Sequence, residues 1–140
     1  MSWIKNEDYV VAYNAKLVIN TGVFIGTKKY LIIVPSIKKE GAGFRHTTTT
    51  YSMGGKSMEE TVEQLLADKS TNEDTLINTI KSWQATDTKI INLSELDDLK
   101  INASWLSKNI VIRHKGQRGW VPLCHSLGDT AKEIKSFYNK

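Results

Sequence analysis

Hydrophobic residues recur at every second position near the start of the chain, between residues 9 and 20. They are Val11, Tyr13, Ala15, Leu17 and Ile19. This period of two is typical of a half-buried β-strand. The Asn-Thr-Gly sequence at 20–22 then indicates a turn.

Two runs of β-branched and aromatic residues follow, at 23–25 and 30–34. The intervening Gly-Thr-Lys-Lys at 26–29 is typical of a turn, so the two runs predict a hairpin. Pro35 is expected to end it, because proline cannot donate a hydrogen bond to a β-ladder. Residues 36–55 show no clear period and fit either an extended edge strand or a long loop.

The hydrophobic period changes to that of a helix at Ser57. One helical face collects Met58, Val62, Leu65 and Leu66. Ser57 and Glu60 have the spacing of a capping box, which predicts a helix start. A second helix is predicted after Thr71 or Asn72, where helical spacing joins Leu76, Ile77, Ile80 and Trp83.

Strand composition returns at 89–93, and 99–103 is expected to form a strand after an acidic turn at 95–98. A hairpin is then predicted from 110–115 and 118–123, with Gly116 and Gln117 as a two-residue turn. In that register Ile112 faces Val121 and Ile110 faces Leu123. All four side chains are expected on one buried face.

A helix is predicted at the end of the chain, from Ser126 to about residue 139. Its hydrophobic positions are Leu127, Ala131, Ile134 and Tyr138, and the spacing of Ser126 and Asp129 indicates a capping box. The order of elements therefore predicts an α+β fold, with antiparallel strands at both ends and two helices between them. We expect one domain over residues 1–140, with the helices in an insertion at about 36–87.

The composition narrows the class of protein without indicating a function. A hydrophobic content of 40% is ordinary for a globular domain, and the formal net charge of +4 gives no indication of nucleic-acid binding. No apolar run has the length of a signal peptide core or a membrane span. Cys124 is the only cysteine, which agrees with a reducing compartment. We therefore expect a cytoplasmic protein without a transmembrane segment.

A phosphate-binding motif is suggested by Gly54-Gly55-Lys56-Ser57 ahead of the first predicted helix. Backbone N–H groups at a helix start, together with a lysine, can hold a phosphate. However, Thr50 stands where a phosphate-binding loop needs its first glycine. We keep Gly55, Lys56 and Ser57 as a second hypothesis, that of a nucleotide-binding enzyme or small hydrolase. The alternative is that these residues only form the cap of an ordinary helix.

No catalytic residue, cofactor or metal ligand is predicted. Cys124 and His125 are neighbours, and neighbours on a strand point to opposite faces, while His114 is expected at the far end of the hairpin. His46, His114 and His125 do not have the close spacing of metal ligands. Trp3, Trp83 and Trp105 are expected to be core or subdomain anchors instead of residues that stack on a ligand.

A cluster of cations is predicted on the outer face of the last hairpin. Arg113 is expected opposite Trp120, and Lys115 opposite Arg118. Like charges in opposite positions are mildly destabilising unless solvent or an anion compensates them. We therefore predict a ligand-binding site at Arg113, Lys115, Arg118 and Trp120. The alternative is a solvated basic turn that protects a sheet edge from aggregation.

The segment 22–35, with its glycine, apolar strand, Thr27, basic turn and second apolar strand, resembles GRAM and bacterial pleckstrin-homology-like domains. The strands expected at 89–93, 99–101, 110–113 and 120–123 and the C-terminal helix are similar to the end of that fold. The resemblance implies a partly open antiparallel barrel that is plugged by a helix and serves binding or scaffolding. Two features depart from the family: the helical insertion, and the first hairpin, which lacks the basic inositol-phosphate motif.

These observations favour a non-enzymatic binding module over an enzyme. The basic hairpin predicts an anionic ligand or a protein as its partner. Fold alone does not determine function.

Overall fold

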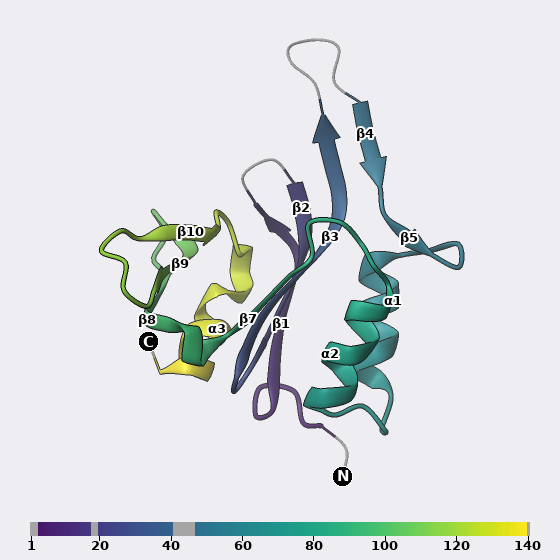
Figure 1. Cartoon of the computed structure of the whole chain (residues 1–140), viewed down its shortest axis with the longest axis horizontal. Coiled ribbons are helices and arrows are strands. Elements are labelled where there is room, and N and C mark those ends of the chain that lie inside the picture. The colour runs from purple at the N-terminus through teal and green to yellow at the C-terminus, as the bar shows by residue number, and fades with distance from the viewer. Residues whose placement is uncertain (1–2, 18–19, 41–46, 140) are drawn as a thin grey trace.

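The computed structural model describes residues 3–17, 20–40 and 47–139, and it is shown in Figure 1. The described chain forms two larger antiparallel sheets, a small hairpin and three α-helices. The first sheet contains β1 (Tyr9–Lys16), β2 (Asn20–Thr27), β3 (Tyr30–Glu40), β4 (Thr47–Thr50) and β7 (Lys89–Asn92). The second sheet contains β8 (Leu96–Ala103), β9 (Lys108–His114) and β10 (Val121–Cys124). The predicted α+β class with antiparallel strands is confirmed.

The first sheet lies in the middle of the molecule and is buried on both faces (Figure 1). Helices α1 (Met58–Ala67) and α2 (Glu73–Ser82) cover one face, where Ile25, Ile32 and Val62 are fully buried. The second sheet and α3 (Ala131–Tyr138) cover the other face. No helix among the described residues is long and apolar enough to cross a membrane.

The two middle helices begin where their capping residues predicted. The Ser57 hydroxyl accepts the backbone N–H of Glu60 at 3.2 Å, which satisfies a donor at the start of α1. At the start of α2, the Asn72 side chain accepts the N–H of Thr75 at 3.0 Å, and the Thr75 hydroxyl accepts the N–H of Asn72 at 2.8 Å. Both predicted helices are confirmed.

The expectation that Pro35 ends a strand is wrong, because β3 continues to Glu40. On one edge of β3, β7 pairs with residues 30–33 and β4 pairs with residues 37–40. Pro35 falls between these two partners, where no ladder hydrogen bond is needed. The opposite pairing with β2 also shifts its register beside Pro35, between Thr21 and Gly22. Residues 36–40 and 47–50 are strands, whereas residues 41–46 lie outside the described part of the chain.

Strand β1 is shorter than predicted, because it ends at Lys16. Its register shifts between Ala12 and Ala15, and Asn14 adopts a left-handed conformation with a φ of 58°, which asparagine tolerates. This bulge precedes the point where β1 meets the second sheet. The Lys16 N–H donates to the Ser126 carbonyl at 2.9 Å, and the Lys16 carbonyl accepts the His125 N–H at 2.7 Å. Leu17 packs against the core that lies between the first sheet, the second sheet and α3, and Ile19 lies outside the described residues.

The expected acidic turn at 95–98 is wrong. The turn comes earlier, because the Asn92 side chain accepts the N–H of Ser94 at 2.9 Å and caps a short 3-10 helix at Leu93–Glu95. Strand β8 therefore begins at Leu96, which is buried.

The last hairpin differs from the predicted two-residue turn. Its connection runs from residue 115 to residue 120, and a register shift pairs Ile110 with Cys124 instead of Leu123. Ile112 faces Val121 as predicted. However, Val121 is 43% exposed, so the four expected side chains do not form one buried face.

The C-terminal helix is confirmed, but its predicted start is not. A 3-10 turn at Gly128–Thr130 precedes α3, and neither segment has a side-chain capping hydrogen bond. Gly128 has a φ of 63°, which breaks the helical path after Ser126. At the other end of α3, the Tyr138 hydroxyl donates to the Thr27 carbonyl at 2.7 Å and fixes the helix to the first sheet.

Candidate binding groove

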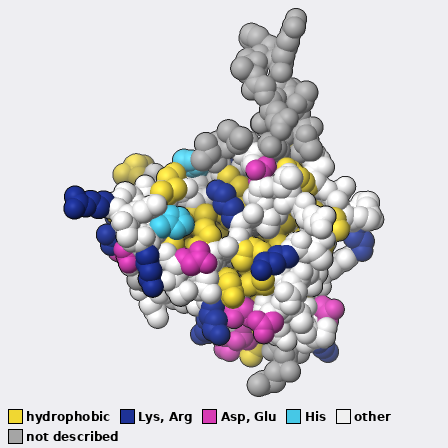
Figure 2. Space-filling view, viewed as in Figure 1, with side chains coloured by type: hydrophobic (Ala, Val, Ile, Leu, Met, Phe, Trp, Pro, Cys, Tyr) yellow, Lys and Arg dark blue, Asp and Glu magenta, His cyan; other side chains and the backbone are white. Residues whose placement is uncertain are grey.

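An apolar groove separates β7 of the first sheet from β10 of the second. It has a volume of about 320 Å³. We call it the edge groove, and it is lined by Lys89, Ile90, Ile91, Ile112, His114, Val121, Pro122 and Leu123. Figure 2 shows hydrophobic side chains at the surface in the middle of this view, with basic, acidic and histidine side chains around them. The two sheets meet at Lys16 and Ser126 but remain apart here.

One wall of the edge groove is a strand with an unpaired edge. Among the described strands, β7 pairs only with β3. The Leu93 N–H donates to the Lys29 carbonyl at 2.7 Å, and Leu31 is opposite Ile91. Because hydrogen-bonded and non-hydrogen-bonded pairs alternate in an antiparallel ladder, the backbone N–H and C=O of Ile91 point toward β3. Those of Ile90 consequently point away from β3.

The opposite wall is closed to strand pairing. Pro122 lies in the middle of β10 and has no backbone N–H. A proline on an edge strand prevents the addition of a further strand. This wall instead offers apolar surface, since Val121 is 43% exposed, while its cross-strand partner Ile112 and the nearby Leu123 are buried. The edge groove is therefore asymmetric, with hydrogen-bonding groups on β7 and apolar side chains on β10.

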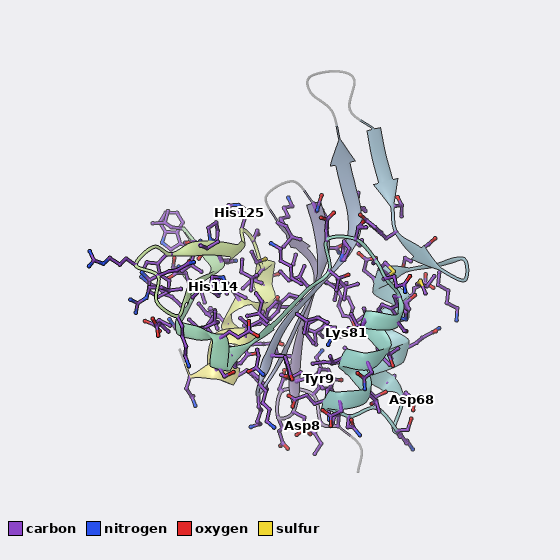
Figure 3. The ribbon with its side chains drawn as sticks, in the orientation of Figure 1. Asp8, Tyr9, Asp68, Lys81, His114 and His125 are labelled. Atoms are coloured by element: carbon purple, nitrogen blue, oxygen red, sulfur yellow. The ribbon has the colours of Figure 1, made fainter. Side chains whose placement is uncertain are left out.

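No Asp or Glu of the described residues is among those that line the edge groove. Lys89 and His114 are the ionisable side chains among its lining residues. Figure 3 shows His114 on the side of the second sheet that faces β7. Lys89 is exposed and His114 is half-buried. The lining therefore favours a ligand with negative charge near an apolar group.

Arg113 and Trp120 are brought together as the sequence predicted. The Arg113 guanidinium lies over the Trp120 ring, 5.5 Å from its centre. Arg113 directly precedes His114 and Trp120 directly precedes Val121. Because His114 and Val121 line the edge groove, the pair lies at its border. The Nε atom of Arg113 is buried and has no hydrogen-bond partner among the described residues.

The other two predicted cations are not paired across the hairpin. Lys115 and Arg118 are both exposed on the connection between β9 and β10. Carboxylates lie on the same hairpin: Asp97 accepts the Gly116 N–H at 3.2 Å, and Asp98 lies opposite Arg113 in the ladder. Sequence reasoning missed these acids because their position depends on the register of β8.

The glycines and Ser57 of the predicted phosphate motif have structural roles. Gly54 and Gly55, with φ values of 59° and 79°, form the turn between β5 (Ser52–Met53) and β6 (Lys56–Ser57). Ser57 caps α1. The Lys56 ammonium donates to the Gln64 side chain at 2.9 Å. These contacts form the β5–β6 turn and the start of α1.

Cys124 is buried, and burial raises the pKa of its thiol to about 11. Its sulfur lies 3.5 Å from the carbonyl oxygens of both Lys16 and Ser126. The thiol therefore stays protonated at neutral pH and acts as a small apolar group that can donate weakly. No group of three His, Cys, Asp or Glu side chains in the described ranges is placed to hold a metal ion, and His46 lies outside them.

The three tryptophans expected in the core differ in their surroundings. Trp3 stacks on Tyr9 with 5.3 Å between ring centres, and both Trp3 and Trp83 pack against the helix-covered core. Trp105 is 87% exposed, so its expected role as a core anchor is wrong. It lies in the tight turn between β8 and β9, where no other described element covers it.

The edge groove was not predicted from the sequence. Its lining comes from three strands that are distant in the chain, and only their arrangement in space forms the site. Pro122 was the signal available in the sequence, because proline is confined to strand edges. No protein-family model matches the chain, and neither a curated protein nor a solved structure matches it.

Proposed function

We propose that this chain is a non-enzymatic binding module, and that it takes up an extended segment of a partner protein in the edge groove. The observation that carries the proposal is the unpaired edge of β7 along an apolar groove. An extended peptide that adds to a sheet edge gains affinity from main-chain hydrogen bonds and specificity from alternate side chains. Here the unpaired edge of β7 would supply the main-chain hydrogen bonds, and the apolar lining of the groove would receive the side chains.

The partner segment would pair with the free N–H and C=O of Ile90. Its alternate side chains would then face Val121 and Leu123 across the groove. A hydrophobic side chain at such a position would cover the exposed part of Val121. Since Pro122 cannot donate a hydrogen bond, the segment would add to β7 alone.

The charges around the edge groove favour an acidic partner segment. Lys89 and His114 line the groove, and Arg113 and Trp120 follow at its border. Lys115 and Arg118 add positive charge on the adjacent connection. Aromatic and arginine side chains of this kind contribute strongly to protein interfaces. Asp97 and Asp98 offset the cations of the hairpin, so we favour an acidic protein segment over a small free anion.

The same proposal retains the resemblance to GRAM and pleckstrin-homology-like domains. Its support is the order of the elements: antiparallel strands, a second sheet of three strands and a final helix that packs between them. Helices α1 and α2 would be an insertion that distinguishes this chain from the rest of that family. A cytoplasmic location also remains a proposal, based on the sequence.

Fluorescence polarisation with labelled six-residue peptides tests the binding proposal. One peptide alternates valine with glutamate, and its control alternates valine with lysine. We expect the acidic peptide to bind more tightly. The Val121→Asp variant should weaken its binding at least about tenfold, because it places a like charge in the apolar groove. Val111→Asp is the matched control, since Val111 lies on the same sheet but does not line the groove.

Two outcomes would contradict the proposal. The first is equal binding of the acidic and basic peptides, or binding of neither. The second is an equal loss of affinity in the Val121→Asp and Val111→Asp variants. Circular dichroism of both variants checks that they are folded.

A further inference from the structure

The turn between β8 and β9 exposes two large hydrophobic side chains. Trp105 is 87% exposed and Leu106 is 77% exposed. We call this turn, Ser104–Trp105–Leu106–Ser107, the hairpin tip. A single exposed apolar residue is common on protein surfaces, but two adjacent ones of this size at such exposure indicate an interaction.

The hairpin tip is held in a defined conformation. The Ser104 N–H donates to the Ser107 carbonyl at 2.9 Å, and the Ser107 N–H donates back to the Ser104 carbonyl at 3.3 Å. Below the tip, the Asn102 side chain donates to the Asn109 side chain at 2.7 Å. The tip therefore presents Trp105 and Leu106 on a supported hairpin.

Lysines lie behind the hairpin tip on the side that faces α3. Lys108 is opposite Ala103 in the ladder. Lys132 and Lys135 border a hollow of about 610 Å³ together with Ala103, and the Lys135 ammonium donates to the Ile101 carbonyl at 3.4 Å. Asp129 lies 3.6 Å from the Lys108 ammonium and compensates one of the three charges.

We propose that the hairpin tip inserts Trp105 and Leu106 into the surface of a membrane that contains anionic lipids. Tryptophan favours the boundary between headgroups and hydrocarbon, and lysines near that boundary are attracted by anionic headgroups. The shape of the tip favours a membrane over a protein. A stable protein interface covers a broad area on each partner, whereas the tip is a narrow projection of two residues.

This site is separate from the edge groove. The hairpin tip joins the start of β9, whereas Arg113 and His114 lie at the other end of the same strand. A strand of seven residues spans roughly 20 Å. The module could therefore bind a membrane at one end of the second sheet and a partner segment at the other.

Vesicle co-sedimentation of the full chain tests the proposal. The vesicles contain phosphatidylcholine alone or phosphatidylcholine with phosphatidylglycerol. We expect binding to the anionic vesicles. The Trp105→Ser/Leu106→Ser double variant should lower the partition coefficient at least about tenfold, since each buried apolar side chain contributes an effect of that size. Trp120→Ser, which changes the exposed tryptophan near the edge groove, is the matched control and should bind as the wild type does.

The charge contribution has its own variant. Lys132→Gln/Lys135→Gln should reduce binding to anionic vesicles while leaving the weak binding to phosphatidylcholine unchanged. No binding of the wild-type chain to anionic vesicles would overturn the proposal, as would equal binding by the Trp105→Ser/Leu106→Ser variant. If the wild type does not bind vesicles and this variant changes its sedimentation coefficient, the tip is a contact between protein copies and the proposal is wrong. Peptide binding in the edge groove should be unaffected by the Trp105→Ser/Leu106→Ser and Lys132→Gln/Lys135→Gln variants.

Discussion

The guanidinium carbon of Arg113 lies 5.5 Å from the centre of the Trp120 ring, across the hairpin formed by β9 and β10. The pair joins the end of β9 to the residue that precedes β10, and the next residues on both strands line the edge groove. It therefore holds one end of the groove wall in place. Its energetic contribution can be measured separately from any binding.

We predict a coupling free energy of about 0.5–1 kcal/mol between Arg113 and Trp120 in the folded state, the range of a partly exposed cation–π contact. Arg113→Gln, Trp120→Leu and the double variant complete a thermodynamic cycle. Urea unfolding monitored by circular dichroism gives the free energy of each protein. Strictly additive losses would show that the two side chains do not interact in solution.

Gly26 limits the approach of α3 to the first sheet. A Cβ atom added at Gly26 would lie 2.5 Å from the Tyr138 hydroxyl oxygen and 3.1 Å from two ring carbons. Gly26→Ala should therefore lower the free energy of unfolding by about 1–3 kcal/mol through overpacking. Gly119→Ala is the control, because its added Cβ meets no atom within 4 Å, and equal effects of the two substitutions in urea would contradict the packing of α3.

The hydrogen bond from Tyr138 to Thr27 makes a separate contribution. Tyr138→Phe removes the 2.7 Å bond between the hydroxyl and the Thr27 carbonyl. We expect a loss of about 1 kcal/mol in the free energy of unfolding, the usual value for such a bond. Thermal unfolding should show a lower midpoint for Tyr138→Phe. An unchanged midpoint would indicate that the end of α3 does not dock on the sheet.

Stability should fall at alkaline pH because of Cys124. Burial raises the pKa of its thiol from 9.0 to about 11. Between these values the folded protein holds a proton that the unfolded chain has released, so the free energy of unfolding decreases as pH rises. The full loss is of order 2 kcal/mol. Urea unfolding at pH 8 to about 11 measures this slope.

The Cys124→Ala variant provides the comparison for the alkaline slope. Its stability should fall less steeply over the same range, although Tyr13 and Tyr138, whose pKa values are also raised by burial, still contribute. Identical slopes for the two proteins would mean that the thiol is accessible to water. Slow alkylation of the folded wild type near neutral pH would support its burial independently.

The capping box of α2 predicts a local effect on stability. Asn72→Ala removes the acceptor of the Thr75 N–H and should cost about 1 kcal/mol. Asn78 lies exposed in the same helix, and Asn78→Ala serves as the control. Chemical unfolding should show a larger loss in the free energy of unfolding for Asn72→Ala than for Asn78→Ala. The reverse order would contradict the observed start of α2.

Local signals in the sequence predicted much of the fold. The helix starts at Ser57 and Asn72 follow from side chains that bond to nearby backbone groups, and these contacts depend on only a few residues. Pro35 was misread because its effect depends on which strands pair beside it. The position of the gap between β7 and β4 is a property of the tertiary structure.

The candidate sites were harder to predict from the sequence, because they also depend on which strands lie side by side in the tertiary structure. The pairing of Arg113 with Trp120 depends only on one hairpin and was predicted. The acids beside them come from β8, and the edge groove combines β7, β9 and β10. Trp105 looked like a core residue because a large aromatic side chain is usually buried. Its exposure is a consequence of the two-residue turn that contains it.

The central claim is that β7 accepts an additional strand, and amide hydrogen exchange followed by NMR tests it most directly. In the free protein, the Ile90 N–H should exchange rapidly with solvent, whereas the Ile91 N–H, which faces β3, should be protected. Addition of the peptide that alternates valine and glutamate should slow exchange at Ile90 and leave Ile91 protected as before. If the peptide binds without slowing exchange at Ile90, or if Ile90 is already protected in the free protein, β7 does not accept a strand and the account is wrong.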